Sequence, residues 1–498
     1  MKRAMKMALL ASAFVALPAE ATTTRVYTLG AVNRYVLDDA NRWLWPHAIL
    51  DYGNLFYLEL FGSGPSDGFT APTSNRAGND APGAMLTGAE LTAVQSTAGG
   101  GFILKLSDEL AIGAHLSDFE NPAVVAFLSG PLAAYSIGDP NAFPYLAGGA
   151  VRPISTANRK FDLFAAYDIP DALAVGLLLT YGSSKYGYFP NPDEAPVQYS
   201  NGTEVARARD DLGASEFRLL ASAGLPMGEE AHIDIGIGFG IHSLSYSPNG
   251  LDAELLFGGN GFELQGDVRA MIGVAEQWEL IPAIAFRSLA FSGEDLAAYG
   301  APISLYTDNG AAATADINRT EVSQSTVLFD IGVAAHYHPV EIVDFWGAAG
   351  FELLRASTSF VHNYQESTDL PRPTPGGGTP GGYEVGSLVN NADAFPYLKI
   401  GLEAQLFTWL DARGGVIKYL RADKVTTLGE DDQNNLPAVD NDVTRDKPFF
   451  DYFVGLAAHY QGFFLDMQLD PNWFARGPYL LSGAGGPMFV NASAGYKY

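Results

Sequence analysis

The chain has 498 residues, no cysteine and a formal net charge of −27 at pH 7. The absence of cysteine excludes a disulfide framework and a thiolate metal site. The acidity argues against nucleic acid as a partner, because phosphate groups attract basic surfaces.

The first 21 residues have the three parts of a secretory signal peptide. Residues 1–6 are basic, residues 8–17 are apolar, and Ala19-Glu20-Ala21 has the small-x-small pattern of a cleavage site. The alternative is a buried first helix, but the stretch is short and flanked by charge. No later apolar run approaches the ~20 residues that a membrane helix needs. We therefore expect an exported protein that is either soluble in the periplasm or a β-barrel.

Residues 22–53 do not alternate between apolar and polar positions as strands do. They contain Leu29-Gly30, Asp38-Asp39-Ala40 and Trp45-Pro46, in that order. This pattern resembles the N-terminal plug segment of the FadL-like family of outer-membrane transporters, which carry long-chain fatty acids and other hydrophobic molecules. The family has Asn before the proline and Ala after it, where this chain has Trp45 and His47. The plug residues that the resemblance implies are Asp38, Asp39, Trp43, Trp45 and Pro46.

The apolar side chains of residues 22–53 point to the same placement. Exposure of Trp43, Leu44 and Trp45 to water would cost ~1.5–3 kcal/mol for each large side chain. We therefore expect this segment to sit inside the barrel.

From residue 54 onward, seven short turns alternate with eight long polar loops, an arrangement that connects sixteen antiparallel strands. The turns lie at residues 107–109, 170–171, 226–230, 275–277, 339–341, 408–411 and 461–462, and the loops at roughly 63–92, 119–157, 185–212, 247–259, 293–319, 361–391, 427–446 and 471–487. Bacterial barrels have short periplasmic turns, long extracellular loops and an even strand number. The sequence predicts an all-β fold, a transmembrane antiparallel β-barrel over residues 54–498. We expect sixteen strands, or fourteen if the first hairpin belongs to the plug.

Apolar and polar residues alternate clearly along the expected strands. Ile233, Ile235 and Ile237 share one face, opposite Asp234 and Gly236. A soluble sandwich would also alternate, with its charged face toward solvent, whereas in a membrane barrel the apolar face meets lipid and the polar face lines the lumen. The lumen residues that we expect include Asp234, Glu263, Asp267, Arg269, Asp330, Lys399 and Glu403. Aromatic residues near strand ends, which fit interfacial girdles, are Tyr181, Trp278, Tyr337, Phe345, Tyr452, Tyr460 and Tyr496.

The last ten residues form a strand that ends on an aromatic residue. Its apolar face carries Ala492, Ala494, Tyr496 and Tyr498. Pairing this edge with the first strand would close the barrel, as a bilayer requires. The ending resembles the C-terminal signal strand of bacterial outer-membrane barrels. That resemblance implies a Gram-negative-type outer membrane, contact with its lipid and lipopolysaccharide, and recognition of this strand by the barrel assembly machinery.

Two features bear on cargo. The loop at 119–157 is unusually apolar and would either pack on the barrel mouth or form a capture patch for a hydrophobic ligand. The capture residues would be Val124, Val125, Phe127, Leu128, Leu132, Tyr135 and Phe143. Gly99, Gly100 and Gly101 begin an apolar strand, and glycines in a strand mark a kink, a bulge or a close approach. By resemblance to the FadL-like family, they would permit a sideways opening of the wall; alternatively, they make room for Trp43 or Trp45.

No sequence pattern indicates an enzyme or a bound cofactor. There is no Gly-x-Ser-x-Gly elbow, no His-Glu-x-x-His helix and no phosphate-binding glycine loop. His336 and His338 would share a metal or, the commoner case, make hydrogen bonds, and the acidic loop at 430–442 is either a calcium site or a solvated loop. We expect neither a metal nor a catalytic residue.

The function that these features favour is a channel or transporter that takes up small, hydrophobic molecules passively. A general porin for polar solutes is the alternative within transport. The third possibility is a non-transporting scaffold that presents surface loops.

Overall fold

The computed structural model describes residues 23–30, 34–60, 98–117, 154–170, 172–188, 197–198, 204–205, 210–228, 230–247, 257–295, 303–306, 312–340, 342–365, 383–428, 441–446, 449–469 and 489–498. The expected signal peptide, all seven residues of the expected capture patch and residues 430–440 of the acidic loop lie outside these ranges.

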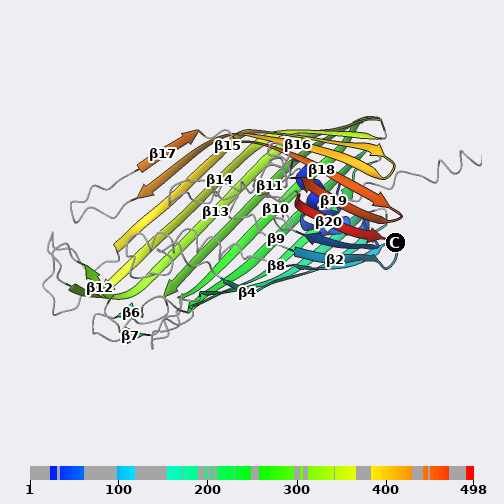
Figure 1. Ribbon diagram of the computed structural model, residues 1–498. Coiled ribbons are helices and arrows are strands. Elements are labelled where there is room, and N and C mark those ends of the chain that lie inside the picture. The colour runs from blue at the N-terminus through cyan, green and yellow to red at the C-terminus, as the bar shows by residue number, and fades with distance from the viewer. Residues whose placement is uncertain are drawn as a thin grey trace, which may run out of the picture.

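Sixteen antiparallel strands form one closed sheet (Figure 1). They are β1 (Leu55–Leu60), β2 (Ala98–Lys105), β3 (Leu110–Ser117), β4 (Ile154–Ile169), β5 (Leu173–Tyr188), β8 (Asp210–Pro226), β9 (Ala231–Ser247), β10 (Phe257–Ala275), β11 (Trp278–Asp295), β13 (Ala312–Val340), β14 (Val343–Gln365), β15 (Tyr383–Phe407), β16 (Leu410–Leu428), β18 (Phe449–Tyr460), β19 (Phe463–Leu469) and β20 (Phe489–Lys497). The barrel closes where β1 pairs with β20, from Leu55↔Lys497 to Leu60↔Ala492. The sixteen-stranded prediction is confirmed, and β1 and β2 belong to the wall, which excludes fourteen.

The strands on one side of the barrel are longer than the sequence predicted. The expected loops at 293–319, 361–391 and 427–446 contain strand residues, because β13 already begins at Ala312, β14 continues to Gln365 and β15 begins at Tyr383. Short strands β12 (Ile303–Tyr306) and β17 (Asn441–Asp446) pair with β13 and β16. Strands β6 (Val197–Gln198) and β7 (Glu204–Val205) form a separate small sheet within the expected loop at 185–212. Figure 1 shows β13–β16 extending well beyond the short strands β2, β19 and β20, away from the short-turn end. Beyond the bilayer no apolar face is needed, so the alternation that reveals strands is lost there.

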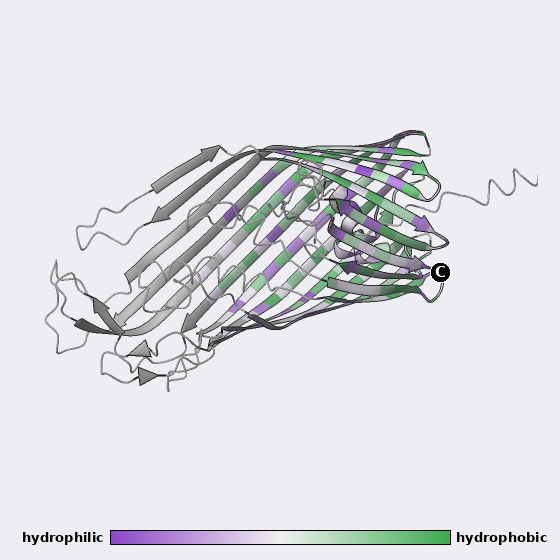
Figure 2. Ribbon diagram, in the orientation of Figure 1, coloured by the Kyte–Doolittle hydropathy of each residue, from purple (hydrophilic) through white to green (hydrophobic). Residues whose placement is uncertain are grey.

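The outer face of the wall is apolar. Ile237 is 66% exposed and Ile241 is 53% exposed, whereas Asp234 on the opposite face of β9 is 2% exposed. Figure 2 shows apolar and polar residues alternating along the strands. A soluble sandwich would expose the charged face instead, so the apolar exterior and closed edge identify the surrounding medium as lipid. Among the described residues, no helix combines the length and apolar character required to cross a bilayer.

Aromatic rings gather at the short-turn end of the barrel. The Trp278 and Tyr337 rings stack at 4.3 Å, and the Phe463 and Tyr496 rings lie 4.5 Å apart. Tyr460, beside the last turn, is 70% exposed. Aromatic side chains favour the membrane–water boundary. This belt therefore marks one boundary, and the short turns place it on the periplasmic side.

Candidate functional site

Residues 23–30 and 34–53, the inner segment, lie inside the barrel at its short-turn end (Figure 1). The segment contains α2 (Thr23–Thr28) and the 3-10 turns η1 (Asp39–Trp43) and η2 (Pro46–Leu50). Asp38 starts η1 with a capping box, because its carboxylate accepts from the Ala40 N–H while Asn41 bonds back to the Asp38 N–H. Pro46 starts η2, where its missing N–H costs nothing. These short turns satisfy the backbone without a strand ladder.

The contacts of the inner segment are spread around the circumference of the wall. The α2 region touches β20, β18, β16 and β15; Arg34 then reaches β13 and β10; and the η1–η2 region reaches β9, β8, β5, β4 and β3. Asn54 connects the segment directly to β1. The contacts therefore extend around the inside of the wall from β20 to β3. They do not follow strict chain order, because Trp43 reaches β3 and β4 whereas His47, further along the chain, lies at β9 and β8.

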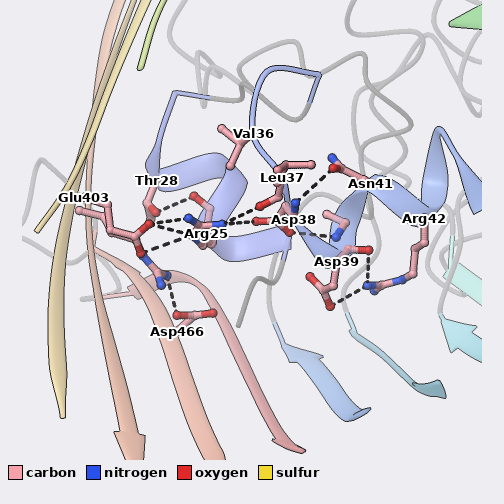
Figure 3. Close-up of polar contacts among 12 residues, drawn as sticks. Arg25, Thr28, Val36, Leu37, Asp38, Asp39, Asn41, Arg42, Glu403 and Asp466 are labelled. Carbon is pink, nitrogen blue, oxygen red and sulfur yellow. Dashed lines mark hydrogen bonds and ion pairs between the residues drawn. The ribbon is translucent and has the colours of Figure 1, made fainter. Parts of the chain in front are cut away.

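The first anchor is Arg25 (Figure 3). Its guanidinium donates to Glu403 on β15 at 2.6 and 2.9 Å and to Asp38 at 3.1 Å. Glu403 also accepts from Arg413 at 2.6 Å, and Arg413 in turn pairs with Asp466. Burial lowers the pKa of Arg25, but Glu403 and Asp38 more than offset this effect and hold it above its usual range. The anchor is therefore a buried network in which Arg25 and Arg413 share Glu403, with Asp38 and Asp466 as their further partners.

The second anchor is Arg34, which bridges two strands. It donates to Asp267 on β10 at 3.1 Å and to Asp330 on β13 at 2.7 Å. The neighbouring Tyr35 hydroxyl lies 2.8 Å from the Tyr397 hydroxyl, which donates to Asp330. Burial raises the pKa of Tyr35 to about 12, and the Asp330 charge adds to that rise. One arginine of the segment thus neutralises two buried wall carboxylates.

The third anchor holds η1. Arg42 donates to the Asp39 carboxylate at 2.7 Å, and its guanidinium lies 4.3 Å from the ring centre of Tyr57 on β1. Burial raises the pKa of Asp39 well above its usual range, and Arg42 offsets part of that rise. Here Arg42 pairs with a carboxylate of the segment itself, and β1 of the wall contributes both the Tyr57 ring and the Glu59 carboxylate, 4.0 Å from the guanidinium.

The fourth anchor is His47 at the start of η2. Its Nε2 lies 2.8 Å from Oδ1 of Asp234 on β9, and its Nδ1 lies 2.9 Å from the hydroxyl of Ser222 on β8. Arg269 donates to the other Asp234 oxygen at 2.6 Å and lies 4.0 Å above the Trp45 ring. The anchor combines hydrogen bonds with a cation–π contact.

Wall glycines let the backbone of the inner segment come close. A Cβ added to Gly176 on β5 would overlap the backbone of Pro46 and His47, and one added to Gly415 on β16 would overlap the backbone at Gly30. Gly236 on β9 would likewise meet the Leu44 carbonyl. Only glycine leaves this space, so the inner surface of the wall is shaped to fit the backbone of the segment.

Part of the seat, by which we mean the wall surface that the inner segment contacts, is apolar. The Trp43 ring lies edge-on to Phe164 at 5.0 Å, and Ile49 packs in the same buried cluster. The inward-facing wall residues of this cluster on β2–β8, which we call the apolar strip, are Ile103, Ala111, Phe164, Ala166, Leu178 and Leu220. The inner wall is therefore not polar throughout.

The structure places the predicted residues as follows. The expected plug residues are all in the inner segment and buried. Of the expected lumen residues, Asp234, Asp267, Arg269, Asp330 and Glu403 contact the segment directly. Glu263 instead joins a network within the wall, with Arg287 at 2.9 Å and His242 at 3.0 Å, and the Lys399 amine lies 4.7 Å above the Tyr397 ring.

Sequence reasoning missed the partners Arg25, Arg34, Arg42 and His47. A signal was present, because basic residues in a short non-strand segment face a lumen that is rich in acids. The match between a particular arginine and a particular carboxylate requires the fold.

Gly99, Gly100 and Gly101 do not leave the wall open in this structure. β2 is paired through all three of them, to β1 on one side and to β3 on the other. They do not make room for Trp43 or Trp45 either: a Cβ on Gly99 would meet the His115 ring at 2.9 Å, and one on Gly101 would meet Tyr57. The Tyr57 and His115 rings stack at 5.5 Å across β2. The glycines serve this cross-strand stack, which sequence patterns do not show.

His336 and His338 lie near the short-turn rim. His336 bonds to Asp344 at 3.1 Å, and His338 bonds to the Glu276 carbonyl at 3.0 Å. In the part of the chain that the structure describes, two groups have the geometry to hold a metal: His336, His338 and Asp344, and the fourth-anchor group of His47, His232 and Asp234.

No family model matches the sequence, and no curated protein matches it. Among solved structures, the chain is similar to the toluene transporter TodX of Pseudomonas putida, with 10% identity over 96% of both chains and a TM-score of 0.35. It is also similar to the toluene transporter TbuX of Ralstonia pickettii, with 9% identity over 68% of this chain and 81% of that chain and a TM-score of 0.30. The ferric yersiniabactin uptake receptor FyuA from Yersinia pestis has 8% identity over 89% of this chain and 79% of that chain, with a TM-score of 0.31.

Likeness at this level carries no information about cargo. The location follows from the wall itself, which is closed, even-stranded and apolar outside. The chain is a protein of the Gram-negative-type outer membrane.

Proposed function

We propose that this chain is an outer-membrane transporter for passive uptake, and that the inner segment closes its periplasmic mouth. The observation that carries the proposal is the circuit of the segment around the short-turn end of the wall, from Ser493 on β20 to His115 on β3. A sixteen-stranded barrel is wide enough for an aqueous channel. A segment seated across that width would close it.

The anchors support a segment that can leave its seat. A buried ion pair contributes less net stability than apolar packing of similar volume, because both charges lose their hydration. A permanent filling would therefore be expected to use apolar contacts throughout. Asp267, Asp330 and Glu403 are instead acidic groups. The arginines of the segment stabilise them when the segment is in place, and water would solvate them once the segment moved.

Small hydrophobic molecules are the cargo class that we propose. The apolar strip carries this proposal, because displacement of Trp43 and Ile49 would uncover Phe164, Leu178 and Leu220 inside the lumen. A lumen for polar solutes alone would have no need of such a surface. The polar network of Glu263, Arg287 and His242 favours the second candidate, a general porin for polar solutes.

Uptake into proteoliposomes separates these readings. We expect a fluorescent medium-chain fatty acid to enter faster than through protein-free vesicles, while a neutral sugar does not. Leu220→Asn should lower fatty-acid entry about tenfold, because it removes ~1.5–3 kcal/mol of apolar contact, whereas Leu220→Met, which keeps an apolar side chain of similar size, should not. Faster sugar entry with unchanged fatty-acid entry would identify a porin. Entry of neither would favour a scaffold.

A further inference from the structure

The fourth anchor brings together three side chains that suit a transition metal. His47 belongs to the inner segment, whereas His232 and Asp234 belong to β9. The Nε2 atoms of the two histidines lie 2.8 and 2.7 Å from the same carboxylate oxygen, Oδ1 of Asp234. The three potential ligand atoms all lie within 4.8 Å of one another.

We propose that His47, His232 and Asp234 bind one Zn²⁺, which clasps the inner segment to the barrel wall at the periplasmic mouth. Imidazole nitrogen and carboxylate oxygen are zinc ligands, and three protein ligands leave a fourth position for water. This site goes beyond the proposed function and can be tested without any transport assay.

The surrounding groups orient the ligands as outer-shell partners do in zinc sites. Arg269 holds Oδ2 of Asp234 at 2.6 Å and so leaves Oδ1 for the metal. The Ser222 hydroxyl lies 2.9 Å from Nδ1 of His47 and can accept a hydrogen bond from the Nδ1–H when Nε2 is a metal ligand. The Asp51 carboxylate, which interacts electrostatically with His47, Asp234 and Arg269, adds a further acidic group beside the site.

The position of the site explains how Zn²⁺ would reach it. The His232 side chain is 36% exposed, whereas those of His47 and Asp234 are 6% and 2% exposed. His232 is the second residue of β9, directly after a short periplasmic turn. One ligand therefore faces the periplasm and two are enclosed. The metal would join residues that lie 187 positions apart in the sequence, 47 and 234.

The second metal-competent group, His336, His338 and Asp344, provides a contrast. All three residues belong to the wall strands β13 and β14. A metal bound there would not touch the inner segment. Removal of this group by His336→Ala with His338→Ala gives a background that keeps the proposed clasp as the one metal-competent group among the described residues.

Calorimetric titration of Zn²⁺ into the EDTA-stripped full chain in detergent, in that background, tests the proposal. We expect one Zn²⁺ per chain. Ser222→Ala, which changes an outer-shell partner, should weaken zinc binding about 10–100-fold. His47→Gln and His232→Gln each remove a ligand and should weaken zinc binding at least as much. His232 lies at the half-exposed rim, so His232→Gln should still fold, as the heat-dependent shift of a barrel on a denaturing gel would report.

Trypsin cleavage after the buried Arg42 gives a second readout that concerns the segment itself. Zn²⁺ should slow this cleavage, EDTA should reverse the effect, and His232→Gln should not respond. The proposal would be overturned if His47→Gln and His232→Gln bound zinc as tightly as the background protein does. Binding only at millimolar Zn²⁺ would overturn it too. Binding without any change in cleavage would overturn the clasp.

Discussion

Arg34→Met is expected to release the inner segment from its seat. Arg34 donates to Asp267 and Asp330, which are both buried, so its loss leaves two buried carboxylates without their ion-pair partner. Removal of one partner from a buried ion pair costs ~3–5 kcal/mol, which shifts the seated-to-released equilibrium by about two to three orders of magnitude. Trypsin cleavage after Arg42 in the folded barrel should accelerate accordingly.

A compensated variant distinguishes charge from misfolding. Arg34→Met combined with Asp267→Asn and Asp330→Asn removes the unpaired charges and should restore most of the protection of Arg42, because removing both partners of a buried interaction is far less costly than removing one. Arg159→Met, at an exposed wall position, should leave protection unchanged. Equal protection in Arg34→Met and the native chain would show that this anchor does not hold the segment.

Gly176→Ala is expected to push η2 off the wall with a single methyl group. The added Cβ would overlap backbone atoms of Pro46 and His47, and backbone cannot yield as the end of a flexible side chain can. Overpacking of this kind costs ~1–3 kcal/mol, or about one to two orders of magnitude in the equilibrium. Channel openings in planar bilayers should become more frequent.

The matched control is Gly266→Ala on β10. Its Cβ would meet nothing within 4 Å, so it carries the same change of residue type in a strand without touching the segment. Gly415→Ala, at the opposite side of the circuit, should open the channel independently of Gly176→Ala. If both inward-facing alanine variants behave like Gly266→Ala, the backbone of the segment does not rest on these glycines.

The sequence predicted the wall well because a bilayer enforces a simple rule. Ile237 and Ile241 face lipid while Asp234 faces inward, so period-two alternation appears directly in the order of residues. The rule fails where lipid ends. Residues 312–319 of β13 have no apolar face to maintain, and the sequence therefore suggested a loop there. The tight turns were found because proline, glycine and acidic residues interrupt the alternation.

The seat of the inner segment was much harder to predict. Composition indicates that Trp43 and Trp45 need burial, but not which strands bury them. The pairing of Arg34 with Asp267 and Asp330 joins positions more than 200 residues apart, and only barrel closure brings those carboxylates together. Gly176 and Gly415 are indistinguishable by sequence from Gly266, because their role depends on what lies across the lumen. The place of Gly99 and Gly101 beside the Tyr57–His115 stack likewise depends on neighbouring strands that the sequence alone does not identify.

Single-channel conductance in planar bilayers tests the central claim, closure of the mouth by the inner segment, most directly. The comparison is between the native chain and a variant that lacks residues 23–53 but keeps Asn54, whose carbonyl accepts from the N–H of Tyr498 and whose side chain accepts from the N–H of Lys105. We expect the native chain to be closed for most of the recording and the deletion variant to show steady open-channel steps, as a sixteen-stranded barrel with an aqueous lumen should. The same conductance in both proteins, with the deletion variant correctly folded, would contradict the account.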